Sequence, residues 1–89
     1  MKLAAYCYKA SELHPDLNGW IEFRQTGEIR KARIVSKAKV RVIIEYDEDL
    51  MMRSVHINDY NKCNKSGWRF WNKHPQGVVH VWEMEGMLT

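Results

Sequence analysis

The segment KVRVIIEYD, residues 39–47, decides the fold class of this chain. Apolar and charged side chains alternate along it with a period of two, which is the period of a β-strand that buries one face. The side chains on the apolar face are Val40, Val42, Ile44 and Tyr46. Because β-branched and aromatic residues dominate this face, we predict a strand over 39–47 whose apolar face lies in the core.

The preceding segment, residues 27–36, has the same pattern, with Ala32 and Ile34 on the side expected to be buried. A short turn at 37–38 joins it to the segment 39–47. Two alternating segments joined by a short turn predict an antiparallel hairpin.

Similar short segments continue in both directions along the chain. The further strands expected are 3–8, 20–24, 50–57, 68–71 and 78–84, and Asn58 is expected to cap a single helical turn at 58–60. Six or seven short strands at this spacing indicate a small barrel or sandwich. A barrel suits 89 residues and removes exposed sheet edges. We therefore expect one all-β domain over 1–89, with its barrel core at about 19–60 and C-terminal strands at 67–85 completing or covering it.

Residues 19–60 combine a first strand, a second strand with a small residue at Ala32, a third of the form V-x-V-x-x-x-Y-D, an acidic turn, a fourth strand and a one-turn helix. This order resembles the SH3-like barrels of the Tudor, Agenet and KOW type. The resemblance implies a small barrel of five to seven short antiparallel strands with one short helical turn. Two features depart from that pattern: residues 29–31 lack the aromatic of methyl-reading Tudor domains, and Glu48-Asp49 replaces a turn glycine.

The resemblance also points to an incomplete aromatic cage. Its members would be Trp20, Phe23 and Tyr46, with Asp47 as the anionic wall. Aromatic faces beside a carboxylate suit a methylated or quaternary cation. The alternative is that Trp20 and Tyr46 belong to the core. Basic residues occupy the positions in 29–31 where the aromatic of methyl-reading Tudor domains is expected. The chain therefore resembles the members of this group that contact nucleic acid more than those that read methylated side chains.

The small net charge of +3 hides two basic segments. Residues 24–41 hold seven basic residues and one acidic residue, a net of +6, and residues 53–73 carry +4, while the turn at 45–49 between them carries −4. Such segregation creates a strong local field on a nearly neutral molecule. The alternative for the basic hairpin is a solvated strand face that keeps the sheet soluble.

The second basic segment also interleaves cations with Trp68, Phe70 and Trp71. This combination suits stacking on unpaired bases while the cations hold phosphates. The period of two places Trp71 on the face opposite Trp68 and Phe70, so we expect Trp71 to be exposed. The alternative is that Trp71 and Trp82 close the bottom of the barrel. The residues expected to contact nucleic acid are Arg30, Lys31, Arg33, Lys37, Lys39, Arg41, Arg69, Trp71 and Lys73.

Several classes of function are disfavoured by what the sequence lacks. Cys7 and Cys63 are far apart and no closely spaced pair of ligands accompanies them, so we expect reduced thiols, no metal and no cofactor. No nucleophile with an adjacent base is evident, which favours a non-catalytic protein. The longest wholly apolar run, residues 42–44, is too short for a membrane span or a secretory signal, so we expect a cytoplasmic address.

The sequence therefore predicts a small non-catalytic protein that binds DNA or RNA non-specifically through a basic hairpin and an aromatic, basic segment. The alternative is a protein–protein interaction module, an inhibitor or adaptor of a host or partner protein such as phages encode. It would dock through an aromatic and methionine surface made of Met51, Met52, Trp71, Met84 and Met87.

Overall fold

The computed structural model describes residues 4–75, which form a five-stranded antiparallel sheet with the strand order β4-β3-β2-β1-β5. The strands are β1 (Asn18–Phe23), β2 (Ile29–Lys37), β3 (Arg41–Tyr46), β4 (Met52–His56) and β5 (Trp68–Trp71), and two 3-10 turns are η1 (Ala10–Glu12) and η2 (Ile57–Asp59). The prediction of an all-β protein is confirmed. No helix in residues 4–75 is long and apolar enough to cross a membrane.

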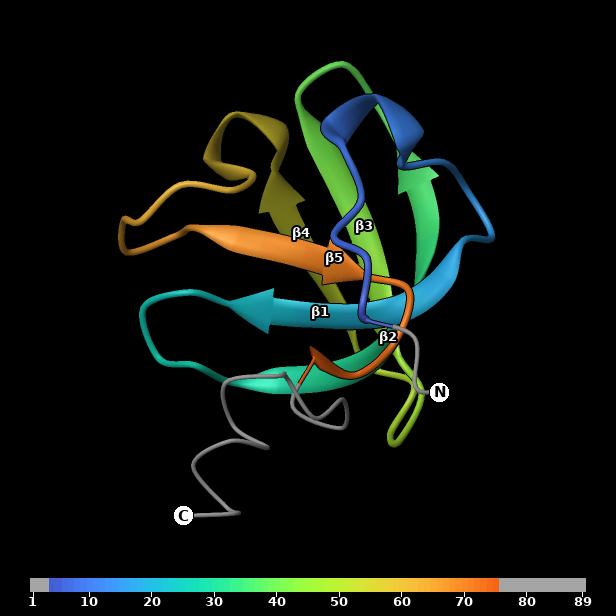
Figure 1. Cartoon of the computed structure of the whole chain (residues 1–89). Helices are drawn as coiled ribbons and strands as arrows, with labels where there is room; N and C mark the ends of the chain where they lie inside the picture. The colour runs from blue at the N-terminus through green and yellow to red at the C-terminus, as the bar shows by residue number, and fades with distance from the viewer. Residues whose placement is uncertain (1–3, 76–89) are drawn as a thin grey trace, which may run out of the picture.

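The hairpin that the sequence predicts is β2–β3. Ala32 lies opposite Tyr46 and Ile34 opposite Ile44, and the register shifts between Ile34 and Ser36. Such a bulge bends a strand, and β2 bends so that β1 and β5 run across β3 and β4 (Figure 1). Val40 lies in the turn before β3 and is 44% exposed, so the buried face begins at Val42 and not at Val40.

The core occupies the concave side of the bent sheet. Its buried side chains are Leu13, Ile21, Phe23, Ala32, Ile34, Val42, Ile44, Tyr46, Val55, Trp68 and Phe70. Full burial of a large aliphatic or aromatic side chain is worth about 1.5–3 kcal/mol, so this set is the main source of stability. Trp68 is fully buried and donates its indole N–H to the carbonyl of His56 at 2.9 Å.

The expectation of a closed barrel is not met, because β4 and β5 are the two outer strands of the sheet and do not pair with each other. The chain turns at η2 as soon as β4 ends, so residues 61–67 lie between the two strands in place of further pairing. We call the opening between β4 and residues 61–67 the seam.

The free edge of β5 is covered by two other segments. The Tyr8 N–H donates to the carbonyl of Phe70 at 2.9 Å, and the Asn72 N–H donates to the carbonyl of Tyr6 at 3.0 Å. The Asn61 N–H bonds the carbonyl of Trp68. The segment 3–8 was expected to be a strand. Within it, Cys7 forms an isolated antiparallel bridge with Trp71.

The C-terminal strand β5 is an integral part of the sheet because it pairs with β1, where Trp20 lies opposite Trp71. The approach is close at Gly19, where a β-carbon would collide with the Trp71 carbonyl and lie 2.7 Å from the Phe70 ring. The predicted strand 78–84 lies outside the described residues.

The predicted helical turn is present but begins one residue earlier, at Ile57. Its cap is His56 and not Asn58, because the His56 side chain accepts the backbone N–H of Asn58 at 3.1 Å.

Candidate functional site

The predicted basic hairpin is largely neutralised by the acidic turn. The Arg30 guanidinium lies 3.0 Å from the Asp49 carboxylate and 3.6 Å from that of Glu48. Its carbon lies 3.7 Å from the centre of the Tyr46 ring. The backbone N–H of Met51 and the Arg30 guanidinium together hold the pKa of Asp49 below its usual range. Arg30 therefore fastens the β3–β4 turn to β2.

The next two cations of the hairpin are also paired. Lys31 lies 3.8 Å from Asp47. Arg33 binds Asp16 at 2.9 Å and the cross-strand Glu45 at 3.3 Å. A phosphate that approached these side chains would first have to compete with their carboxylates.

The opposite end of the hairpin carries cations that form no ion pair within residues 4–75. Lys37 donates to the carbonyl of Ala10 at 2.9 Å, and Arg41 donates to the Ser54 hydroxyl at 3.3 Å. No ion pair within residues 4–75 includes Lys39 or Lys73. Of the nine predicted contact residues, Arg30, Lys31 and Arg33 are thus neutralised, while Lys37, Lys39, Arg41 and Lys73 are not.

The four residues of the expected aromatic cage are not brought together. Phe23 and Tyr46 are buried in the core, whereas Trp20 is half-buried on the other face of β1. Asp47 is engaged by Lys31. Arginines already cover the two core rings, since Arg53 lies 4.2 Å from the Phe23 ring centre and Arg30 covers Tyr46. A methylated cation therefore finds no cage among these residues.

The aromatic residues of β5 divide as their period predicts. Trp68 and Phe70 are fully buried. Trp71 is half-buried beside Trp20 on the outer face, and its indole N–H donates to Glu22 at 2.9 Å. The Trp20 ring in turn meets His74 edge-on at 4.7 Å. Trp71 is therefore less accessible than expected.

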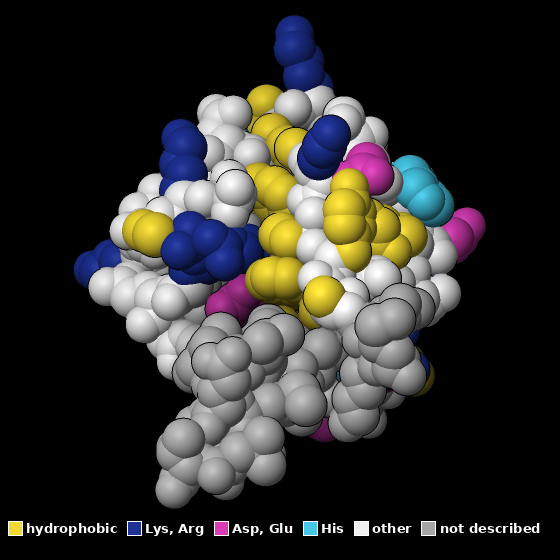
Figure 2. Space-filling view, in the orientation of Figure 1, with side chains coloured by type: hydrophobic (Ala, Val, Ile, Leu, Met, Phe, Trp, Pro, Cys, Tyr) yellow, Lys and Arg dark blue, Asp and Glu magenta, His cyan; other side chains and the backbone are white. Residues whose placement is uncertain are grey.

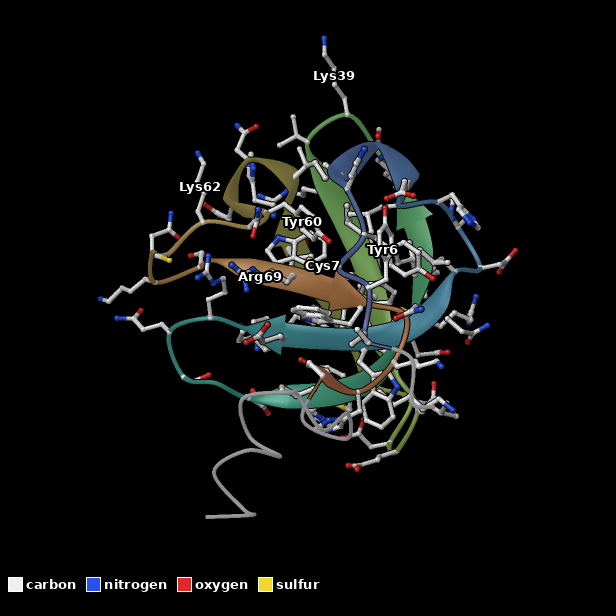
Figure 3. All side chains as sticks on the ribbon, viewed as in Figure 1. Tyr6, Cys7, Lys39, Tyr60, Lys62 and Arg69 are labelled. Atoms are coloured by element: carbon white, nitrogen blue, oxygen red, sulfur yellow. The ribbon has the colours of Figure 1, made fainter. Side chains whose placement is uncertain are left out.

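An apolar groove of about 560 Å³ lies beside β5. It is lined by Cys7, Tyr8, Lys9, Ala10, Tyr60, Asn61 and Arg69. Cys7, Tyr60 and Arg69 lie together in the middle of the view in Figure 3, and a strip of hydrophobic side chains runs down the same face in Figure 2.

Tyr60 holds this groove together. Its hydroxyl donates to the carbonyl of Tyr8 at 2.6 Å and accepts the Phe70 N–H at 3.1 Å. Burial raises the pKa of Tyr60, and burial likewise raises the pKa of the Cys7 thiol, whose sulfur lies 3.9 Å from the Tyr60 oxygen. Both groups are therefore neutral at physiological pH, so the part of the groove that Cys7 and Tyr60 line carries no charge.

Cations border one side of the groove. Arg69 donates to the Asn61 side chain at 2.7 Å, and Arg24 donates to the Asn61 carbonyl at 3.1 Å. Lys62 extends outward on the same side of the view as Arg69, whereas Lys39 projects from the turn between β2 and β3 at the top of the view (Figure 3). None of these four cations has an ion pair in the described part of the chain. We call this set, with the groove, the cationic groove.

Sequence reasoning missed Lys9, Arg24 and Lys62 as site residues. The +4 charge of residues 53–73 was the signal for Lys62. Nothing in the sequence indicates that residues 6–8 would lie beside β5 and supply a wall of the groove. Within the described residues, no three metal-ligating side chains gather in one place.

Comparison with protein-family models, with curated proteins and with solved structures gives no match.

Proposed function

We propose that this protein is a small non-catalytic nucleic-acid-binding protein with an SH3-like arrangement of strands. The assignment is supported by four consecutive antiparallel neighbours, β1 to β4, and by the helical turn η2 between β4 and β5. It is an open variant, in which the seam replaces the last row of barrel pairing.

The observation that carries the proposal is the cationic groove. Its uncharged floor, with Cys7, Tyr8 and Tyr60, offers apolar surface to unpaired bases. Arg69 and Lys62 beside the floor, and Lys39 farther along at the β2–β3 turn, are available to meet phosphates. Contact of a base with an aromatic side chain contributes roughly 1–3 kcal/mol and tolerates any sequence. Phosphate contacts add affinity that falls with salt because counterions are released. Single-stranded DNA or RNA fits this surface better than a duplex, whose bases are already stacked.

The test is fluorescence anisotropy with a labelled single strand of ~10 nucleotides, titrated at several salt concentrations. Binding should weaken steeply between about 50 and 200 mM salt. The double variant Lys39→Gln/Lys62→Gln should bind more weakly, and the slope of log affinity against log salt should fall by roughly 0.7 for each lost contact.

The matched control is Lys31→Gln, which removes a lysine that is already paired with Asp47. Its affinity and salt slope should stay close to those of the unmodified protein. Absence of binding at low salt would refute the proposed function. An equal effect of Lys31→Gln would refute the cationic groove as the binding surface.

A second candidate function is favoured by one exposed apolar cluster. Leu50, Met51 and Met52 are 68%, 61% and 60% exposed at the start of the outer strand β4. Hydrophobic side chains beside a free strand edge suit a protein partner. Affinity capture after nuclease treatment should then recover one stoichiometric protein, and Met51→Ser/Met52→Ser should abolish its capture. Recovery of only nucleic-acid-bridged material would exclude this function.

A further inference from the structure

A second, smaller pocket of about 180 Å³ opens at the seam. β4 supplies one wall, with Arg53, Ser54 and His56, and the loop 65–66 supplies another. Unlike the cationic groove, this pocket is lined mainly by polar side chains. It exists because the sheet does not close, which leaves room between β4 and the loop.

Arg53 is the fixed cation of the seam pocket. It lies on the same face of β4 as the buried Val55, and its guanidinium carbon lies over the Phe23 ring at 4.2 Å. Stacking on a ring holds the guanidinium plane but leaves its N–H groups at the rim of the plane free to donate. Within residues 4–75 no carboxylate or other acceptor binds them. Such an arginine can bind an anion without first losing another partner.

Two further cations reach the seam pocket. Arg41 enters from β3, and the one hydrogen bond of its side chain within residues 4–75 goes to the Ser54 hydroxyl, at 3.3 Å. Lys65 enters from the loop and has no polar partner in the described chain. Among the described residues, Asp59 is the single carboxylate in the lining. Three permanent cations against one carboxylate leave the pocket with an excess of two positive charges.

Neutral donors complete the seam pocket. The Tyr46 N–H donates to the Met51 carbonyl just before β4, and the Ile57 N–H just after β4 donates to the Val40 carbonyl. In an antiparallel pair, successive residues direct their backbone groups alternately toward the partner strand and away from it. Met51 and Ile57 direct theirs toward β3, and Ser54 lies an odd number of residues from each of them. The Ser54 N–H therefore points away from β3, outward from the free edge of β4. The Nδ1 atom of His56 accepts the Asn58 N–H, which leaves Nε2 as the ring nitrogen that can donate.

We propose that the seam pocket binds a phosphate monoester, which on a nucleic acid is a terminal phosphate. A monoester carries a charge close to −2 near neutral pH, and this matches the pocket's excess charge better than the single charge of an internal phosphodiester. The planar guanidiniums of Arg41 and Arg53 suit bidentate bonds to phosphate oxygens. Assigning the ligand to a nucleic acid rests on the proposed function, whereas the phosphate chemistry of the pocket does not.

Two measurements on the full chain test this inference. The first compares the affinity for one labelled oligonucleotide with a terminal hydroxyl or a terminal phosphate, at the 5′ end and at the 3′ end in separate experiments. We expect a phosphate at one of these ends to strengthen binding about tenfold, equivalent to ~1.4 kcal/mol. The second titrates inorganic phosphate and follows amide NMR shifts, which should move and saturate at Ser54 and Ser66.

The variants Arg53→Gln and Lys65→Gln should each remove the preference for a terminal phosphate. Lys65 is on an exposed loop, so its variant remains informative if loss of the Arg53–Phe23 contact unfolds the chain. The matched control is Lys39→Gln, outside the pocket, which should weaken both oligonucleotides equally and preserve their ratio.

The outcomes separate the two proposals. Equal affinity for all oligonucleotide ends, without phosphate shifts at Ser54 and Ser66, would overturn the seam pocket and leave the proposed function standing. Phosphate shifts without binding of any oligonucleotide would overturn the proposed function and assign the pocket to small phosphate monoesters.

Discussion

Replacing Tyr60 by phenylalanine should destabilise the protein far more than the loss of one oxygen atom suggests. The hydroxyl joins three segments, because it donates to the Tyr8 carbonyl at 2.6 Å and accepts the Phe70 N–H at 3.1 Å, while its ring meets Trp68 at 4.6 Å. Phenylalanine keeps the ring contact. The variant leaves one backbone donor and one backbone acceptor in a half-buried place without their partner.

Each unsatisfied buried group costs roughly 1–3 kcal/mol, and water can reach this half-buried place, so we expect a total loss of about 2 kcal/mol. For a domain of this size the melting temperature should fall by about 8–16 °C. Urea unfolding followed by tryptophan fluorescence, to which the buried Trp68 contributes, measures the free energy of unfolding directly.

The matched control is Tyr6→Phe, since Tyr6 is exposed and its hydroxyl has a single partner, Glu12, at 2.7 Å. Surface substitutions of this kind change stability by less than about 0.5 kcal/mol. If Tyr60→Phe were as stable as Tyr6→Phe, the hydroxyl would not hold the N-terminal segment to β5, and the reasoning would be refuted.

Two further outcomes are expected. Because the pKa of Asp49 is lowered by the Met51 N–H and Arg30, its contribution to stability is present above the unfolded pKa of about 3.9 and is lost as the pH falls through the folded value. Asp49→Asn should therefore lower the urea midpoint at neutral pH and have less effect in acid, and an equal loss at every pH would contradict this. Cys7, half-buried with a raised pKa, should react with iodoacetamide more slowly than the exposed Cys63, as peptide mass spectrometry would show. Equal rates would mean that the groove opens freely.

The strand period predicted the pairing of the central hairpin because most of its residues have a clear preference for one face, although Val40 lies in the turn and is exposed. Val42, Ile44 and Tyr46 are buried as predicted, and Ile44 and Tyr46 lie opposite Ile34 and Ala32 across β2–β3. The same period already argued against the aromatic cage. Trp20 and Phe23 are separated by an odd number of positions on one strand, so they face opposite sides of the sheet.

Charge pairing was harder to predict because it depends on register. Arg33 is neutralised by Glu45 across the ladder and by Asp16 from a separate loop, and neither neighbour can be identified from the alternation of residues in β2 alone. The open seam was hard to predict for the same reason, since it depends on how strands pair and not on the alternation within one strand. A periodic strand such as β4 indicates which face is buried but not whether its far edge finds a partner.

The position of charge along β3 gives the molecule an electric dipole. Lys37, Lys39 and Arg41 lie at its beginning, and Asp47, Glu48 and Asp49 follow its end, where Arg30 and Lys31 offset them only partly. Six residues of strand separate the two ends by about 20 Å. A polyanion in dilute salt would exert a torque that turns the Lys39 end toward it before contact. At physiological salt, where the Debye length is about 8 Å, this orientation is screened, so it would alter the association rate at low salt more than the lifetime of the complex.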